Sequence, residues 1–464
     1  MSKSKIAAVI DIGSSAVRLH ISQWNGHKVT SLDKLEKPTQ IGKEVFSTGY
    51  ISFDTVRSLS AILGGFCEKA REYGITSIHT IASTALREAS NQAYILDHLL
   101  TRNKIDVQVL EDTEVSALLI GALKNEDYSK TKKTLLVYGG TGTTDFELIG
   151  GEEIILAHSI QTGLLKIAEM LNEAADFSRH IDCMAEEYLN TFLMRKNRIQ
   201  DLFKADGILF GAADIQPLCR LFGVDSECAA INIENKKVLE IYETYRSVSV
   251  PQICHKYGLH MQQGEILYAM LTFLTALLHI TKSKKLACAQ ISLADAMLNL
   301  ILTPGARRRY DESLRTGAIT SALDLAARYC SDMNHCGYVA GVALTLFEKL
   351  RKGFGFFKKQ NLFLNIACLL HESGHYTNCD DMQEASFDLV KDAHIYGLCS
   401  RETLLTANII APQSLLGVAR SAPRASMLND EEVLFAAKMH ALLHLSDTLD
   451  FSHKQKAKLL GVKL

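Results

Sequence analysis

The sequence predicts three parts, two α/β domains followed by an all-helical domain. Strand and helix patterns alternate as far as Pro304; beyond it strand patterns nearly vanish while amphipathic helical patterns continue. A strand–turn–strand signature also occurs twice, as AAVIDIGSSAVRLHISQW from Ala7 and as TLLVYGGTGTTDFELIGG from Thr134. We place the three domains at residues 1–128, 129–302 and 303–464.

The periodicity of the apolar residues locates the elements of the first domain. Residues 6–22 and 28–33 have strand patterns, and Phe53–Tyr73 carries apolar residues at the spacing of one helix face. Short apolar runs then alternate with helical patterns. The remaining predicted elements are, in order, the strand Ser77–Thr84, the helix Ala85–Arg102, the strand Val107–Leu110 and the helix Glu114–Leu123.

The second domain opens like the first. Residues 134–160 repeat the opening strand pattern, and helices follow from about Gly163. The segment Thr303–Glu312, TPGARRRYDE, combines Pro, Gly and charge as linkers do. We therefore expect the helical domain to begin there.

Composition excludes several classes of protein. The chain has 464 residues, 47% of them hydrophobic, and a formal net charge of −2, which allows a large core and argues against a nucleic-acid partner. No apolar stretch reaches the uninterrupted length of a membrane span and no cleavage site follows the N-terminal lysines, so we expect a cytoplasmic protein without membrane contact. The 11 cysteines include no CxxC pair, and we expect them to be reduced thiols.

The two Gly/Ser/Thr turns in the repeated signature predict a clamp on a phosphate chain. Small residues let the backbone approach a ligand closely, and successive N–H groups can point into one concavity that suits phosphate oxygens. The alternative is two ordinary β-hairpins. The candidate phosphate-binding residues are Gly13, Ser14 and Ser15 in the first turn and Gly140, Gly142, Thr143 and Thr144 in the second.

Four motifs give the chain a family resemblance. The segments are DIGSSAVRL from Asp11, ASTALREASN from Ala82, LEDTEVSALLIGAL from Leu110 and SIQTGLLKIAEML from Ser159. With them the chain resembles the exopolyphosphatase/guanosine pentaphosphate phosphatase (Ppx/GppA) family. The resemblance implies two actin-like, sugar-kinase-like (ribonuclease H-like) α/β domains. Between Asn334 and His375, the helical region resembles the HD-type domain of longer family members.

The resemblance implies a phosphoanhydride hydrolase that releases terminal phosphate from inorganic polyphosphate or guanosine pentaphosphate by in-line attack of water. Glu114 would be the catalytic base and Arg87 would clamp a terminal phosphate. Asp11 and Asp145 would support Mg²⁺ or Mn²⁺. An alternative for Glu114 remains open, because carboxylates are also favoured at the start of a helix by its dipole. Glu111 and Asp112 are nearby substitutes.

Departures from the family pattern support a second hypothesis. The family's second loop begins with a metal-linked aspartate, and this chain has Tyr138 there, which is not an anion at neutral pH. GAAD from Gly211 and SLADAM from Ser292 also replace family motifs. The alternative function is therefore a catalytically degenerate sensor or regulatory protein that binds polyphosphate or guanosine penta- or tetraphosphate. A sugar or acid kinase shares the fold but is disfavoured, because no adenosine-binding motif is evident.

The helical domain carries part of a metal-binding pattern. HD-type hydrolases hold a metal with a first His, a His-Asp pair and a distant Asp; His335 and His371 match, but Glu372 replaces the paired Asp. Asp447 and Asp450 are acidic residues in the distant segment. We expect the two histidines to be hydrogen-bonded in a helical core rather than to bind a metal. The resemblance also implies a homodimer.

Three basic clusters remain. In the family, such residues near domain junctions line a polyphosphate channel, whereas most basic runs are solvated faces, which we favour here. The clusters are Lys282–Lys285, Ala306–Tyr310 and Lys349–Lys359.

Overall fold

The structure is a computed structural model. It describes residues 5–14, 16–124, 133–140, 143–151, 153–160, 163–164, 167–168, 205–212, 215–224, 230–245, 248–377, 382–410 and 428–457. Among the predicted site residues, Ser15 and Gly142 lie outside these ranges, as do Ala213 and Asp214 of the GAAD motif. The chain divides into two compact units, Met1–Glu153 with Ile160–Ser313, and Ile154–Ser159 with Leu314–Leu464.

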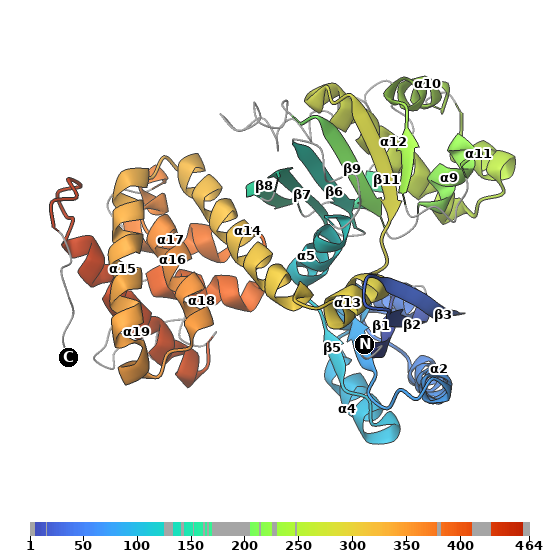
Figure 1. The fold of residues 1–464 in the computed structure, drawn as a ribbon, viewed down its shortest axis with the longest axis horizontal. Helices are drawn as coiled ribbons and strands as arrows, with labels where there is room; N and C mark the ends of the chain where they lie inside the picture. Colours follow the sequence, from blue (N-terminus) through green and yellow to red (C-terminus); the bar gives the residue numbers. More distant parts are fainter. Residues whose placement is uncertain are drawn as a thin grey trace. The chain divides into compact units, whose positions relative to one another are not determined.

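A five-stranded sheet forms the first part of the first unit (Figure 1). Its strands are β1 (Lys5–Ile12), β2 (Ala16–Trp24), β3 (Val29–Pro38), β4 (His79–Ala82) and β5 (Val107–Val109). Their order is β3-β2-β1-β4-β5; β1, β2 and β3 form an antiparallel meander, whereas β4 and β5 continue the sheet in parallel. The helices are α1 (Ile41–Thr48), α2 (Phe53–Glu72), α3 (Thr84–Glu88), α4 (Gln92–Asn103) and α5 (Asp112–Leu123).

The predicted helix Ala85–Arg102 is two helices, which corrects the sequence prediction. The backbone is extended at Ala89, between α3 and α4. Asn91, in this break, donates from its side chain to the Ile51 carbonyl (2.8 Å) and accepts from the Ile51 N–H (3.1 Å). This tertiary tether holds the connection away from helical geometry, and no local signal in the helix predicts it.

A six-stranded sheet repeats the opening topology. Its strands are β6 (Thr134–Gly139), β7 (Thr144–Gly150), β8 (Glu153–Ile160), β9 (Gly207–Ala212), β10 (Ala230–Ile233) and β11 (Lys285–Gln290), in the order β10-β11-β9-β6-β7-β8. The β6/β7 hairpin corresponds to β1/β2, and β9 and β11 add in parallel as β4 and β5 do. The repeated signature in the sequence is therefore a structural repeat.

Helices accompany the second sheet within the same unit. They are α9 (Gln216–Phe222), α10 (Asn235–Tyr245), α11 (Val250–Tyr257), α12 (Met261–Thr281) and α13 (Leu293–Leu302). The window Gln263–Thr281 of α12 has the length and hydropathy of a membrane span, which the sequence analysis did not expect, but 78% of it is buried, as in a core helix.

One apolar cluster joins elements of both sheets. It includes Val9 of β1 and Ile81 of β4 together with Leu136 of β6. Helices α5 and α13 contribute most of its other side chains, and α13 packs against β1. Because β1 and β6 share this core, the turns at their carboxyl ends belong to one compact unit.

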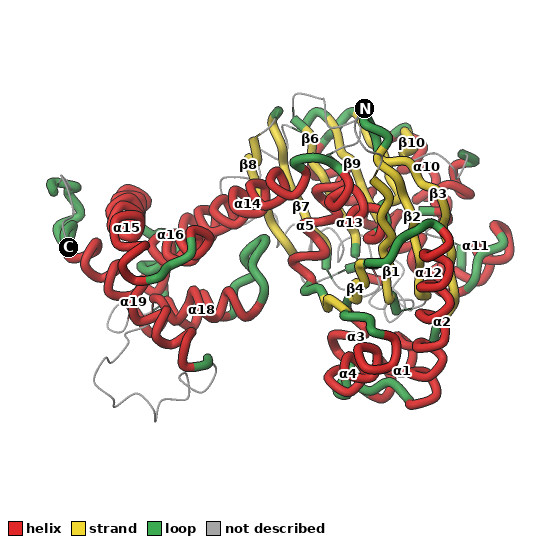
Figure 2. The backbone as a smooth tube through the Cα atoms, turned by 60° about the horizontal axis from the view of Figure 1, so that its bottom comes forward, coloured by secondary structure: helices red, strands yellow, loops and turns green. Residues whose placement is uncertain are grey.

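The second unit is helical apart from residues 154–159, which belong to strand β8. All described strands end by Gln290, and the described residues after it form helices and connecting segments only (Figure 2). The main helices are α14 (Ala306–Arg328), α15 (Met333–Phe354), α16 (Asn361–Leu370), α17 (Met382–Lys391), α18 (Ser400–Ile410) and α19 (Asp430–Thr448). The predicted helical C-terminal part is confirmed.

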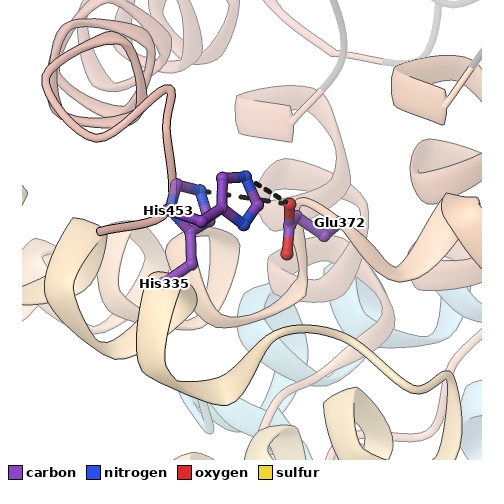
Figure 3. A group of neighbouring side chains, drawn as sticks. All are labelled: His335, Glu372 and His453. Atoms are coloured by element: carbon purple, nitrogen blue, oxygen red, sulfur yellow. Dashed lines mark ion pairs between the residues drawn. The ribbon is translucent and has the colours of Figure 1, made fainter. Parts of the chain in front are cut away.

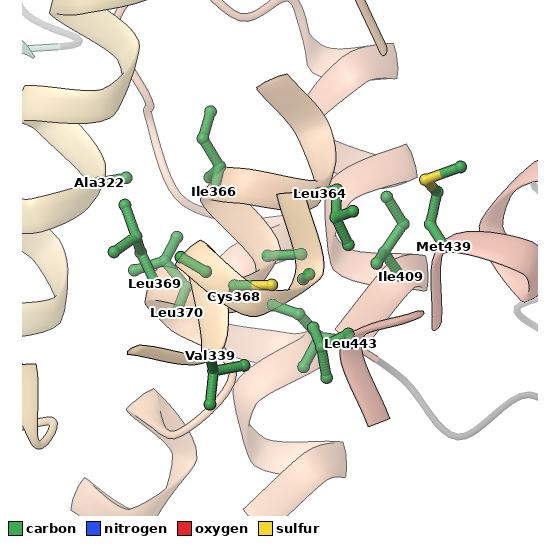
Figure 4. Packing of buried hydrophobic residues seen from close by; sticks show 14 of the residues in the cluster. Ala322, Val339, Leu364, Ile366, Cys368, Leu369, Leu370, Ile409, Met439 and Leu443 are labelled. Atoms are coloured by element: carbon green, nitrogen blue, oxygen red, sulfur yellow. The ribbon is translucent and has the colours of Figure 1, made fainter. Parts of the chain in front are cut away.

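Helix α16 lies at the centre of this unit's core (Figure 4). Its side chains Leu364 and Leu370 are fully buried and pack with Val339 of α15, Ile409 of α18 and Leu443 of α19. An apolar helix of ten residues buries nearly its whole surface here, which is favourable by about 25 cal/mol per Å² of apolar area. This core fixes the ends of α15, α16 and α19.

Candidate functional site

The two predicted phosphate turns share an equivalent backbone hydrogen bond. Gly13 N–H donates to the Ala16 carbonyl (3.0 Å), and Gly140 N–H donates to the Thr143 carbonyl (2.9 Å). A Cβ atom on Gly13 would lie 3.0 Å from the Ala16 oxygen, and one on Gly140 would lie 2.9 Å from the Thr143 oxygen. Both turns therefore need glycine for close backbone approach.

Each turn is also fixed by a following segment. The Ser14 carbonyl accepts from Gly42 N–H in α1 (2.8 Å), and the Gly140 carbonyl accepts from Leu164 N–H (2.8 Å). Carbonyl oxygens of both turns are thus used inside the protein, which preorganises the turn backbone. Helix α1, which the sequence analysis did not predict, supplies one of these anchors.

Asp11 is a buried carboxylate near the end of β1. Burial raises its pKa to about 6, and the charges of Arg18 and His20 offset this only in part. Arg18 lies opposite Asp11 in β2 but forms an ion pair with Glu36 (3.2 Å). The negative charge of the buried Asp11 carboxylate is therefore only partly offset by nearby positive charge.

Tyr138 and Asp145 face each other across the β6/β7 hairpin, and both are buried. Burial, followed by the charges of Asp145 and Asp11, raises the pKa of the Tyr138 phenol well above its usual range. The phenol is therefore neutral and lies within electrostatic reach of both carboxylates.

Asp145 is held by hydroxyl groups. Its Oδ2 accepts from Ser116 Oγ of α5 (2.5 Å) and from Thr143 Oγ1 (3.3 Å). Thr144, another predicted phosphate ligand, is fully buried. The sequence analysis missed Ser116, although it lies inside the LEDTEVSALLIGAL motif.

Glu114 lies at the start of α5, and Arg87 of α3 reaches the same place with its side chain. Arg87 Nη1 donates to the Leu110 carbonyl (2.9 Å) and Nη2 pairs with Asp112 Oδ1 (2.8 Å), while the side chain is 16% exposed. Glu114 is the third residue of the helix, and its Oε2 accepts from the Glu111 N–H (3.0 Å). This is a capping-box contact, so the helix-start role left open by the sequence is present.

The altered SLADAM motif has a structural role. Asp295 Oδ1 lies 2.8 Å from His20 Nδ1, and its Oδ2 pairs with Lys34 Nζ at 2.8 Å. Burial opposes ionisation of Asp295, but these two partners outweigh it and hold its pKa below the usual value. The motif therefore ties α13 to β2 and β3.

Two family models match the chain. The Ppx/GppA phosphatase family matches residues 20–294, and Ppx/GppA phosphatase, domain III, matches residues 318–463. The chain belongs to the Ppx/GppA phosphatase family. The predicted resemblance is thereby confirmed.

Solved structures of Ppx/GppA proteins have the same fold. The crystal structure of the Aquifex aeolicus family member is 18% identical and covers 64% of this chain and 96% of its own, with a TM-score of 0.54. An exopolyphosphatase from Cytophaga hutchinsonii is 14% identical and covers 64% of this chain and 97% of its own, with a TM-score of 0.53. The actin-like α/β fold expected from the sequence is confirmed.

In this Ppx/GppA chain, the helical unit contains the histidines singled out by the sequence. His335 is fully buried between Asp450 Oδ2 (3.0 Å from Nδ1) and Asp447 Oδ1 (3.1 Å from Nε2). Burial opposes protonation, but the two aspartates outweigh it and raise the His335 pKa to about 9. His371 Nδ1 donates to the Cys368 carbonyl (2.8 Å). Both histidines are buried and hydrogen-bonded among helices, as expected, and the absence of a bound metal stays a prediction.

Proposed function

We propose that the chain hydrolyses phosphoanhydrides and releases terminal phosphate from inorganic polyphosphate or guanosine pentaphosphate. Membership of a phosphatase family supports the general activity. The observation that carries the proposal is the pair of equivalent glycine turns, fixed in one unit with Asp11 and the start of α5. Phosphoryl transfer depends on positioning and charge neutralisation, which such a site supplies.

Arg87 of α3 and Glu114 of α5 would act together at the start of α5. The Arg87 guanidinium can exchange its Asp112 partner for phosphate oxygens, which it would bind bidentately. Glu114 would orient the attacking water and accept its proton. The α5 N-terminus also carries a positive partial charge that favours an anion.

Asp11 fits a divalent cation. Its raised pKa of about 6 indicates a buried carboxylate with too little positive charge around it. Mg²⁺ is commonly held by one or two carboxylates together with substrate phosphates, so Asp11 with the substrate is a sufficient set, and Asp145 adds negative charge. A bound Mg²⁺ or Mn²⁺ would neutralise charge on the transferring phosphoryl group.

Tyr138 favours a second candidate function, a phosphate-binding sensor without turnover. A neutral phenol stands where the family has a carboxylate, which weakens cation binding at this position. In that case the same turns would bind polyphosphate or guanosine tetraphosphate, and no phosphate would be released.

The test measures phosphate release by the full chain from polyphosphate and guanosine pentaphosphate with Mg²⁺ or Mn²⁺. Under the hydrolase proposal, Glu114→Gln lowers the rate by about 100-fold or more, whereas Glu68→Gln on the exposed face of α2 leaves it unchanged. Binding without release supports the sensor. If the chain neither binds these compounds nor releases phosphate from them, both proposed functions are contradicted.

A further inference from the structure

An exposed aromatic surface lies where α15 ends and the chain turns toward α16. Phe354 is the last residue of α15 and is 46% exposed, and Phe357, in the turn that follows, is 73% exposed. Phenylalanine is among the residues most often buried, so two exposed rings this close together indicate a binding surface. The proposed phosphatase function uses neither ring.

Stacking fixes the position of the Phe354 ring. It lies nearly parallel to the ring of Phe356, with centroids 5.8 Å apart and 13° between the planes. Phe356 in turn lies parallel to the buried ring of Phe347, at 5.4 Å and 8°, and both belong to the core of the unit. The three rings therefore form a stack that begins in the core, and Phe354 is its exposed end.

Backbone hydrogen bonds hold the turn that carries Phe357. Gly355 has a φ of 71°, in the left-handed region, and its N–H donates to the Arg351 carbonyl at the end of α15. The Phe357 N–H donates to Gln360 Oε1 (2.8 Å) in the 3₁₀ turn Lys358–Gln360. Because this backbone is already ordered, a ligand that binds there pays little additional ordering cost.

Basic side chains accompany these rings. The segment Lys349–Lys359 contains five basic residues and no acidic one. Lys438 of α19 reaches the same surface, with its Nζ 6.0 Å from the centre of the Phe354 ring and 5.7 Å from that of Phe356. Ring faces attract a cation at such distances, so this positive charge is held beside the stack.

The lysines nearest the rings carry charge that no described carboxylate neutralises. Among the described residues, no ion pair joins a carboxylate to Lys352, Lys358 or Lys438. By contrast, the Glu372 carboxylate in the same unit lies 4.0 Å from His335 and 3.5 Å from His453 (Figure 3). The surface at the end of α15 therefore presents positive charge that an anionic ligand can neutralise.

We propose that this surface binds single-stranded nucleic acid. Its residues, which we call the aromatic–lysine patch, are Lys352, Phe354, Phe357, Lys358 and Lys438. Unpaired bases would stack on the two phenylalanine rings, and the lysines would bind the phosphates. Phenylalanine has no hydrogen-bonding group with which to read a base edge or a ribose hydroxyl, so the contact would accept any sequence of RNA or DNA.

The composition of the patch favours this ligand over two others. Lysine is depleted at protein–protein interfaces, and the patch has none of the Trp, Tyr and Arg that dominate binding there. Inorganic polyphosphate offers negative charge but no base to stack on the rings. The sequence analysis expected the Lys349–Lys359 cluster to be a solvated face and argued against a nucleic-acid partner. The net charge of −2 still limits such a contact to a local patch.

The test follows the fluorescence anisotropy of labelled oligo(U) and oligo(dT) as the full chain is added. We expect both to bind. The logarithm of the association constant should fall with the logarithm of the salt concentration with a slope of about −2, because each of the three lysines contributes about −0.7 on a single strand. A duplex of the same length should bind about tenfold or more weakly, because its bases are already stacked on one another.

Four variants separate stacking from charge. Phe357→Ala and Phe354→Leu should each weaken oligo(U) binding about fivefold or more, and leucine keeps an apolar side chain where Phe354 packs. Lys358→Gln should reduce the salt slope by about 0.7. The matched controls are the exposed Phe53→Ala in α2 and Lys236→Gln in α10, which should bind as the wild type does. Phosphate release should be unchanged in the patch variants, because the two phosphate turns lie in the other unit.

A second readout needs no variant. Oligo(U) that contains 4-thiouridine should cross-link to Phe354 or Phe357 under near-ultraviolet light, as located by mass spectrometry. Three results would each overturn the proposal: no binding at low salt, which would leave the patch to a protein partner; unchanged affinity in both phenylalanine variants, as for a ligand held by charge alone; and cross-links confined to other parts of the chain.

Discussion

Arg87 shows at the scale of one residue how an internal partner can compete with a substrate. Its guanidinium is shared between the Leu110 carbonyl and the Asp112 carboxylate. Under the proposed function, a terminal phosphate would therefore have to displace Asp112 to gain a bidentate contact with Arg87. The motif identified Arg87, but the sequence carried no sign that its charge is already paired.

Substituting Asp112 and substituting Arg87 should shift the KM for polyphosphate in opposite directions. Asp112→Asn removes the competing charge, so we expect KM for polyphosphate to fall several-fold. Arg87→Lys cannot bind bidentately, so we expect KM to rise about tenfold or more. Steady-state phosphate release measures both, and thermal melting checks that each variant is folded. Parallel shifts of the two variants would count against the clamp.

The single substitution Tyr138→Asp tests whether a divalent cation binds near this residue. A carboxylate here would be buried beside Asp11 and Asp145, and we expect the variant to lose about 3 kcal/mol or more of stability without divalent cations. Mg²⁺ should restore much of this loss in the variant and have less effect on the wild type. Thermal melting with and without Mg²⁺ measures the difference, and equal Mg²⁺ effects would contradict it.

At the scale of elements, glycines of similar appearance in the sequence have opposite roles. Gly140 lies in a turn where a Cβ atom meets a carbonyl oxygen at 2.9 Å, whereas a Cβ atom on Gly65 in helix α2 meets nothing within 4 Å. The sequence identified the first as a turn glycine. It could not distinguish crowded from open positions, because the crowding comes from the fold.

A matched pair of alanine variants follows from this difference. Gly140→Ala should destabilise the chain by about 1–3 kcal/mol, because the turn must open. Gly65→Ala should stabilise it by about 0.5–1 kcal/mol, because alanine favours the helix interior. Midpoints of chemical denaturation measure both. The same sign for the two variants would refute the geometric argument.

Local sequence patterns predicted the helices and strands well where an apolar repeat runs over many residues. They failed where contacts between distant segments determine where an element ends. Helix α2 begins at Phe53 as predicted and ends at Glu72, one residue early. Asn91, by contrast, breaks a helical pattern through bonds to Ile51, which is 40 residues away in the chain. The same reason explains why Ser116, which contacts Asp145 29 residues away, was missed.

At the scale of the whole molecule, histidines whose pKa is lowered by desolvation make the second unit sensitive to acid. Burial, helped by the charges of Arg328 and His394, lowers the His158 pKa to about 4, and burial also lowers the pKa values of His394 and His440. Below pH 6.5 these histidines bind protons in the unfolded chain but stay neutral in the native state until a lower pH. The free energy of unfolding therefore falls as the pH falls. His335, with a raised pKa, changes stability only above pH 6.5 and does not offset this loss.

His158 should account for a measurable part of this loss of stability with falling pH. Lowering the His158 pKa from 6.5 to about 4 corresponds to about 3.4 kcal/mol at most, lost between pH 6.5 and 4. His158→Gln should therefore show a shallower fall of the unfolding midpoint over this range, whereas His27→Gln in an exposed turn should follow the wild type. Identical slopes for His158→Gln and the wild type would contradict the assignment.

The arrangement of two sheets followed by a helical part could be predicted from the sequence, because it depends on a repeated motif and on composition. The repeated hairpin signature became two sheets of related topology, and the loss of strand patterns marked the helical part. The domain boundary at residue 302 and the homodimer stay predictions. Both depend on contacts between distant surfaces, which no local pattern encodes.

The His335–Asp447 contact joins positions 112 residues apart in the chain. In polymer terms it closes a long loop, and fixing a loop of about 100 residues removes on the order of 4.7 kcal/mol of unfolded-chain entropy when the link is permanent. A hydrogen bond, unlike a permanent link, is made only in the native state, so the unfolded chain keeps this freedom and each folding event has to close the loop again.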